Sequence, residues 1–198
     1  MALKLVVRTV TVVLVLCLMV LGVLLYRVES RHPTVVASDE PPGAAIGKFS
    51  PRAAPLPAPP VSFADQSGKT VTLADFRGRV VLINLWATWC APCVHEMPSL
   101  ARLQARLGRL TVLAISEDRQ GAAVVPPFVQ KLGLDGLAVY LDPKNDVDHA
   151  FGVEGLPTSI LIDRDGRILG ELQGAADWDS QDMVKLIEGY LGAADGKG

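Results

Sequence analysis

The sequence predicts an α/β fold in which a mixed central sheet is flanked by helices. Three observations predict it. The run Val80–Trp86 is apolar and rich in branched residues, which is typical of a strand buried on both faces. Two strand-like runs around a late turn precede an amphipathic helical stretch. After the first run, apolar residues recur at helical spacing, at Met97, Leu100, Leu103 and Leu107.

A short hairpin is expected as an extension at the start of this domain. Its strands are Val61–Phe63 and Thr70–Leu73, and a polar turn at residues 65–68 joins them. The first buried strand then leads into a helix that Pro98 should kink, because proline lacks the N–H for one helical hydrogen bond. Leu110–Ser116 is predicted as a second buried strand.

Residues 117–155 are interpreted as a βα insertion. It should hold a helix around Phe128–Leu132, a strand Leu137–Leu141 and a short helix near Val147–Phe151. The pair Pro126–Pro127 obscures where its first helix begins.

The domain should close with an antiparallel hairpin and a helix. The hairpin strands are Thr158–Ile162 and Ile168–Gln173, and Met183–Leu191 forms the amphipathic helix. The composition fits such a domain, because 49% hydrophobic residues in a chain of 198 can build a core. A net charge of −2 gives no electrostatic footprint for nucleic acid, so that class of function is set aside.

The N-terminus predicts one transmembrane helix. Thr9–Tyr26 is a stretch of 18 residues without a charge, near the lower limit for spanning a bilayer. The positive charges before it favour a cytoplasmic N-terminus. A cleaved signal peptide ending near Ala37 is the alternative. That site lies about ten residues beyond an apolar run that already exceeds a signal peptide's usual length, so the uncleaved anchor is favoured.

Four segments follow from these patterns. Residues 1–29 are a cytoplasmic stub and anchor, 30–54 a tether rich in Pro and Ala, 55–192 the folded domain and 193–198 a flexible tail.

A pair of cysteines marks the candidate site. Cys90 and Cys93 lie two residues apart where the buried strand gives way to the helix. Free N–H groups and the helix dipole lower the pKa of a thiol at that place, so Cys90 is the expected attacking sulfur. Cys93, one turn further on, is placed to resolve a mixed disulfide, and Pro92 suits an early helical position.

Two structural interpretations of the pair are weaker. A disulfide across a two-residue spacer restricts little chain entropy, so it would be a poor staple. A structural zinc site needs four ligands, and the only further cysteine, Cys17, lies in the apolar N-terminal run. Neither a metal nor another cofactor is expected. The strand before the pair and the helix after it favour redox chemistry.

The stretch from Trp89 to Pro98 resembles the thioredoxin superfamily, and within it the membrane-anchored TlpA/ResA-like branch. The resemblance extends over residues 55–192 and includes Leu73–Arg79, Gly155–Thr158 and the late turn Asp163–Gly166. It implies a thioredoxin-like fold and a thiol–disulfide oxidoreductase that acts mainly as a reductant of protein disulfides.

The resemblance also implies a location and partners. The domain is expected in the periplasm, tethered to the inner membrane. Its partners would be disulfide-bearing proteins of cytochrome c maturation or respiratory copper-site assembly, with a transmembrane thiol carrier as electron donor. A copper-binding metallochaperone is the alternative function, in which Cys90 and Cys93 bind Cu(I) together with His95 or His149.

Further site residues follow from the resemblance. Pro157 corresponds to a proline with a cis peptide bond that faces the cysteine pair in the family, which leaves the backbone of Leu156 open to an extended substrate segment. Trp89 is expected to form an apolar rim for the partner, next to Ala91 and Pro92.

Asn84 departs from the thioredoxin pattern. Thioredoxins carry a buried aspartate at this strand position, and a neutral amide cannot act as a general base. Glu96 is the candidate substitute, because it follows Cys93 by three residues and so shares its helix face. A solvated surface carboxylate is the alternative interpretation of Glu96.

Overall fold

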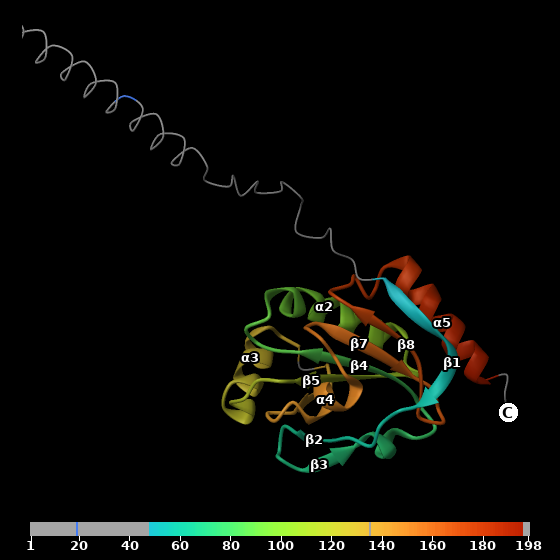
Figure 1. Cartoon of the computed structure of the whole chain (residues 1–198), viewed down its shortest axis with the longest axis horizontal. Helices are drawn as coiled ribbons and strands as arrows, with labels where there is room; N and C mark the ends of the chain where they lie inside the picture. The colour runs from blue at the N-terminus through green and yellow to red at the C-terminus, as the bar shows by residue number, and fades with distance from the viewer. Residues whose placement is uncertain (1–18, 20–47, 135, 196–198) are drawn as a thin grey trace, which may run out of the picture. The chain divides into compact units, whose positions relative to one another are not determined.

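In the part of the chain that the structure describes, residues 19, 48–134 and 136–195, eight strands form one mixed sheet (Figure 1). The structure is a computed structural model. The strand order is β1-β8-β7-β4-β5-β6-β2-β3. The central strands β4 (Val80–Trp86), β5 (Leu110–Ser116) and β6 (Val139–Leu141) are parallel. The expected mixed sheet is therefore confirmed.

The outer strands run antiparallel to their neighbours. On one side of β4 lie β7 (Thr158–Ile162) and β8 (Arg167–Gln173). On the other side, β6 is followed by the hairpin of β2 (Ser62–Asp65) and β3 (Thr70–Thr72). Both predicted hairpins are present, with bounds within about two residues of those expected.

Every residue of β4 is buried, because the strand contacts core on both faces of the sheet. Leu82 and Trp86 pack into the core under one set of helices, whereas Ile83 and Leu85 pack into the core on the opposite face. Asn84 alternates with Ile83 and Leu85, so its side chain lies on the face of Leu82 and Trp86.

The helices divide between these two cores. The first core contains residues of α2 (Ala91–Arg106), α3 (Val125–Lys131) and α5 (Gln181–Asp195). The second contains residues of the 3-10 helix η1 (Leu73–Phe76) and of α4 (Asp146–Phe151). A second 3-10 helix, η2 (Gly121–Ala123), precedes α3. α4 lies where the sequence predicts it, whereas α3 overlaps the predicted helix but begins at Val125, so it includes Pro126 and Pro127 in its first turn.

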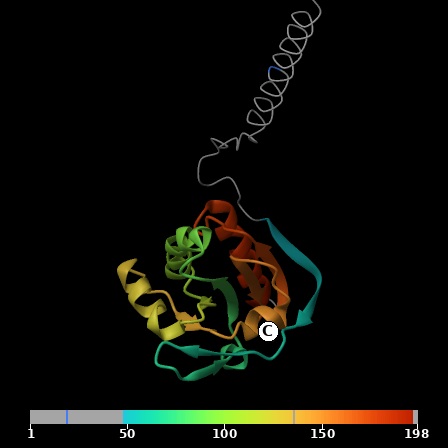
Figure 2. The ribbon, with the colours of Figure 1, turned by 60° about the vertical axis from the view of Figure 1, so that its left-hand side comes forward.

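The strand β1 (Phe49–Pro57) corrects the predicted domain boundary, because residues 49–54 were assigned to the tether. It pairs antiparallel with β8, and Figure 2 shows it at the edge of the sheet away from the β2–β3 hairpin. β1 contains three prolines, which cannot donate hydrogen bonds to a neighbouring strand, and an edge strand tolerates them. Gly170 makes room for this strand: a Cβ there would lie 2.4 Å from the ring of Phe49.

The C-terminal boundary also moves. α5 continues to Asp195, so residues 193–195 are helical and not part of the expected tail. The predicted anchor, Thr9–Tyr26, lies outside the described residues apart from Met19. Among the residues that are described, no helix is both long enough and apolar enough to cross a membrane.

Candidate active site

The cysteine pair lies at the junction between β4 and α2, as predicted. Cys90 and Cys93 form a disulfide with an S–S distance of 2.01 Å. Cys90 is the N-cap residue of α2, Pro92 is in the first turn, and the Cys93 N–H donates to the Cys90 Sγ at 3.3 Å. The sulfur that should attack a partner therefore sits against an N–H of the helix N-terminus, which favours its thiolate.

Cys90 is largely buried, although it is the expected attacking sulfur. Its exposed fraction is 6% and that of Cys93 is 0%. Cys90 is nearly covered because its sulfur turns back onto the first turn of α2 and packs in the core. Of the two cysteines only Cys90 retains access to solvent, which fits its role as the attacking sulfur.

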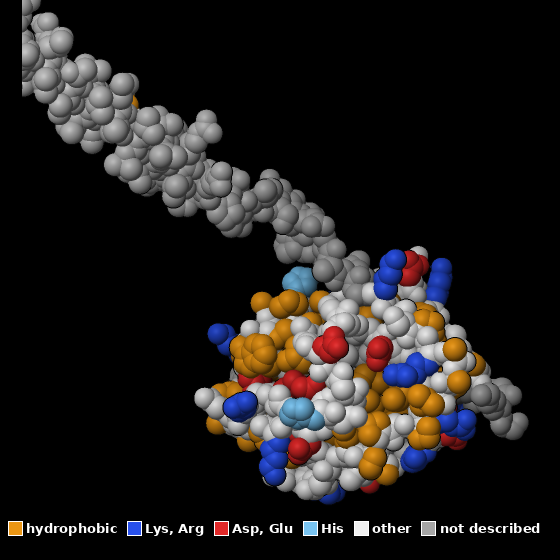
Figure 3. Space-filling view, viewed as in Figure 1, with side chains coloured by type: hydrophobic (Ala, Val, Ile, Leu, Met, Phe, Trp, Pro, Cys, Tyr) orange, Lys and Arg blue, Asp and Glu red, His pale blue; other side chains and the backbone are white. Residues whose placement is uncertain are grey.

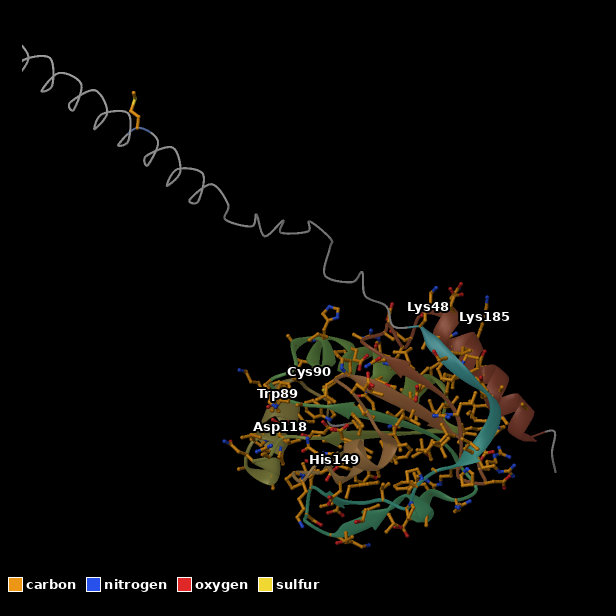
Figure 4. The ribbon with its side chains drawn as sticks, viewed as in Figure 1. Lys48, Trp89, Cys90, Asp118, His149 and Lys185 are labelled. Carbon is orange, nitrogen blue, oxygen red and sulfur yellow. A yellow bond between two sulfur atoms is a disulfide. The ribbon has the colours of Figure 1, made fainter. Side chains whose placement is uncertain are left out.

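An apolar surface surrounds this junction. Trp89 is 71% exposed, and Ala91 and Pro92 are exposed beside it. Figure 4 labels Trp89 and Cys90 at one end of the domain, and Figure 3 shows hydrophobic side chains gathered on the surface there. An exposed aromatic side chain next to a reactive sulfur is suited to contact a partner protein.

The second loop of the site contains a cis peptide bond between Leu156 and Pro157. Thr158 pairs with Leu85, so this loop lies beside the end of β4 from which the cysteine loop begins. Leu156 packs against the core cluster that includes both cysteines. Its N–H and C=O have no hydrogen-bond partner among the described residues, so an extended segment can pair with them.

Glu96 is buried rather than solvated, which excludes the surface interpretation. Its exposed fraction is 2%. One oxygen, Oε1, accepts from Asn84 Nδ2 at 2.8 Å. The other, Oε2, accepts from the Ala176 N–H at 2.9 Å and from Trp178 Nε1 at 3.0 Å. Burial raises the pKa of Glu96 to about 7, and the three hydrogen bonds oppose that rise.

Asn84 joins Glu96 to the strand that follows the cis-proline loop. Asn84 and Ser159 are cross-strand partners, and Asn84 Nδ2 donates to Ser159 Oγ at 2.9 Å. Both residues are almost fully buried. The amide at the position of the thioredoxin aspartate is therefore bonded to the acid predicted to replace that aspartate.

The loop between β8 and α5 holds Glu96 from the other side. The Gly174 N–H donates to the carbonyl of Pro157 at 2.9 Å, and the Trp178 N–H donates to Ser99 Oγ at 3.0 Å. Sequence reasoning missed Ser159 and Trp178. Ser159 carries a signal, since it is a polar residue inside an apolar strand two positions after Pro157. Trp178 is a lone aromatic residue in a stretch of small and acidic residues, which is a signal for burial.

Two acidic residues after β5 were also missed. Asp118 accepts from the N–H and hydroxyl of Thr88 and from Ser116 Oγ, so it fixes the segment before the cysteines. Glu117 is 5% exposed, and its Oε1 has no partner among the described residues. Burial, followed by the charges of Asp148 and Asp142, raises the pKa of Glu117 to about 7.

The ligands of the copper alternative do not converge. His95 and His149 are both exposed. Within the ranges described, no group of three or more His, Cys, Asp or Glu side chains is arranged to hold a metal ion. The geometry of the pair is that of a dithiol–disulfide site, and it lends no support to a metal centre.

Comparisons with known proteins agree with this geometry. Residues 53–187 match the Redoxin family model. A protein of Bacillus thuringiensis subsp. konkukian named Thiol-disulfide oxidoreductase ResA is 36% identical over 136 residues, which are 68% of this chain and 74% of the relative. Its namesake in Geobacillus thermodenitrificans is 31% identical over 162 residues, 80% and 82% of the two chains.

Solved structures give the same result. A putative thioredoxin from Neisseria meningitidis has a TM-score of 0.61 at 33% identity, covering 70% of this chain and 92% of that one. A putative thiol:disulfide interchange protein DsbE from Chlorobium tepidum has a TM-score of 0.59 at 28% identity, covering 76% and 99%. The thioredoxin-like fold is thereby confirmed.

Proposed function

The chain belongs to the Redoxin family and is a ResA-like thiol–disulfide oxidoreductase, and from that premise we propose that it acts mainly as a membrane-tethered reductant of protein disulfides. The observation that carries this proposal is the cysteine pair at the start of α2, next to an exposed tryptophan and an open loop backbone. The proposed location is the periplasmic face of the inner membrane, with Thr9–Tyr26 as the anchor.

The reaction requires the dithiol form. The Cys90 thiolate attacks one sulfur of a partner's disulfide, which forms a mixed disulfide and releases one partner thiolate. Cys93 then loses its proton and attacks the Cys90 sulfur, which releases the second partner thiolate. Two electrons pass to the partner, both of whose thiolates take up protons, and the Cys90–Cys93 disulfide remains. A transmembrane thiol carrier would return the pair to the dithiol.

Glu96 is proposed to accept the proton that Cys93 loses in the second step. Cys93 must be deprotonated to attack, and an acid with a pKa of about 7 can accept a proton and return it near neutral pH. The carboxylate has a second effect. Its negative charge opposes thiolate formation, and a dithiol whose thiolate is less stabilised is a stronger reductant. This supports the reducing direction.

The partner is proposed to bind across the apolar surface and the loop. Trp89, Ala91 and Pro92 would contact its side chains, while the backbone of Leu156, held beside the cis Pro157, would pair with its extended backbone. A cysteine in that segment would then lie in line with Cys90. Apocytochrome c and proteins that assemble respiratory copper sites are the proposed partners, in keeping with the resemblance to the ResA-like branch.

Trapping of the mixed disulfide tests the proposal. In Cys93→Ser the second step cannot occur, so we expect Cys90 to stay linked to its partner, and mass spectrometry of the adduct identifies that partner. Cys90→Ser is the matched control, because it keeps one thiol but removes the attacking one. Equal capture by both variants, or an adduct with no cysteine-containing protein, would contradict the proposal.

A further inference from the structure

All the hydrogen-bond partners of the Glu96 carboxyl group are donors, and none of them accepts from it. Asn84 Nδ2 faces one oxygen, and the Ala176 N–H and Trp178 Nε1 face the other. This set suits a carboxylate, which only accepts. A protonated Glu96 carries an O–H that also needs an acceptor. With all three partners unchanged, that hydrogen would point at another donor.

Asn84 is the one partner among these that can change its role. A backbone N–H cannot accept a hydrogen bond, and an indole Nε1–H is a donor only. An amide side chain carries NH₂ and C=O on the same carbon, so half a turn exchanges donor for acceptor in place. The Asn84 Oδ1 is buried and has no partner among the described residues, so no hydrogen bond at that atom opposes the turn.

Ser159 suits both orientations of Asn84. Its Oγ now accepts from Asn84 Nδ2, and no acceptor for its own hydroxyl hydrogen is present in the described part of the chain. A hydroxyl can donate as well as accept. After the turn, the Asn84 Oδ1 would receive hydrogen bonds from both Glu96 and Ser159. Before the turn the Asn84 Oδ1 has no partner among the described residues, and after it the Nδ2 would have none, so the number of unpartnered atoms stays the same.

We propose that Asn84 is a two-way positioning residue: its amide donates to the Glu96 carboxylate and turns to accept from the protonated acid, with Ser159 reversing its own hydrogen bond. The inference rests on the proposed role of Glu96 as the proton acceptor for Cys93. It explains why an amide can stand at a position where thioredoxins carry an acid. The amide takes no proton itself, but it gives both protonation states of Glu96 a partner.

Among the described residues, no charged group contributes to the pKa shift of Glu96. The Asn84 side chain on β4, Ser159 on β7, and Ala176 with Trp178 in the loop before α5 are all uncharged. On α2, Cys90 and Cys93 do not titrate while they form the disulfide. His95 precedes Glu96 on α2 and Asp177 lies between Ala176 and Trp178, but both side chains are exposed and interact with each other. The protonation of Glu96 is therefore the event that Asn84 should follow.

NMR spectroscopy of the oxidised full chain tests the inference without interference from thiol titration. The chain has only two asparagines, Asn84 and Asn145, so selective ¹⁵N labelling yields two side-chain amides. As the pH falls through about 7, the Asn84 NH₂ should lose its cross-peaks to Ser159 and Glu96. The midpoint of this change should equal that of the Glu96 carboxyl ¹³C shift. Asn145, at the start of α4, is the internal control.

Glu96→Gln provides a second measurement. The glutamine oxygen should accept from Ala176 and Trp178, and its NH₂ should then face Asn84, as the O–H of a protonated acid would. Asn84 should hold the turned orientation at every pH in this variant. Cross-peaks that persist through the titration of Glu96 and in Glu96→Gln would overturn the inference. If the unsubstituted chain, after reduction of the Cys90–Cys93 disulfide, exchanges normally with a small disulfide, that outcome leaves the proposed function standing. Absent exchange would count against the function instead.

Discussion

Glu96 and Glu117 are two buried glutamates whose pKa values are both raised to about 7, and they reach that value by different routes. Glu96 is held by three donors that offset part of the cost of burial. Glu117 has an oxygen without a partner among the described residues, and two aspartates add repulsion to burial. A perturbed pKa alone therefore does not identify a working acid. What distinguishes Glu96 from Glu117 as the candidate acid of the site is its set of three hydrogen-bond donors and its place on the helix that begins at the cysteines.

The largest expected difference between the two glutamates is in catalysis. Glu96→Gln should slow resolution of the mixed disulfide by roughly 100-fold, the usual scale for loss of a general acid–base group. It should also lower the apparent thiol pKa values, because a negative charge near the pair is removed. Stopped-flow decay of a mixed disulfide and thiolate absorbance against pH measure the two effects.

Glu117→Gln is the matched control for that experiment. It removes a buried carboxyl group with a similarly raised pKa, which the charge of Asp148 repels and which has none of the donors that surround Glu96. We expect its resolution rate to stay within about twofold of the unchanged chain. Equal slowing by both substitutions would mean that the donors around Glu96 do not mark it out as the acid of the site.

The second expected difference is in stability and concerns Glu117. In the unfolded chain its pKa returns to 4.5, whereas in the folded chain it is about 7. Between these values the folded state binds more protons. The protonation of Glu117 therefore contributes its full stabilisation of the folded state below pH 4.5, and this contribution is lost as the pH rises to about 7. Glu117→Gln keeps the site neutral, so it should stabilise the fold by on the order of 1–2 kcal/mol above pH 7, after allowance for solvent screening.

Urea unfolding at pH 5 and pH 8 measures this effect. The gain from Glu117→Gln should be present at pH 8 and small at pH 5. Glu154→Gln, at an exposed glutamate, should give no gain at either pH. A gain of the same size at both pH values would trace to packing and not to ionisation.

Local features of the site could be predicted from the sequence, because spacing along one chain segment fixes them. The cysteines, Pro92 and Glu96 share the start of one helix, so their relation follows from helical geometry. The partners of Glu96 could not be predicted. Ala176 and Trp178 are separated from it by 80 and 82 positions, and only the docking of the loop against α2 brings them there.

The fold shows the same division. The strand and helix order of the domain could be predicted from apolar periodicity, including the insertion between residues 117 and 155. β1 could not, because its prolines at 51, 55 and 57 are typical of a linker. It becomes a strand because β8 offers a free edge, and Gly170 leaves space for Phe49. Glu117, followed by Asp118 and Arg119, likewise has the local pattern of a surface turn, yet it is buried.

The smallest expected effect separates the two buried tryptophans near the site. Trp178 Nε1 donates to Glu96, whereas Trp86 Nε1 has no hydrogen-bond partner among the described residues, and both side chains are fully buried. Trp178→Phe removes a donor from the charged form of Glu96, so the pKa of Glu96 should rise further, by roughly one unit. Trp86→Phe removes an N–H that stabilises neither form of Glu96, so the pKa of Glu96 should not move.

The carboxyl ¹³C shift of Glu96 against pH in the oxidised chain measures the pKa in both variants. Equal shifts in the two variants would show that lost packing, and not the lost donor, sets the pKa. A shift in Trp178→Phe alone would establish that the loop before α5 lowers the pKa of Glu96 by hydrogen bonding. No hydrogen bond contributes to the pKa of Glu117 in this way.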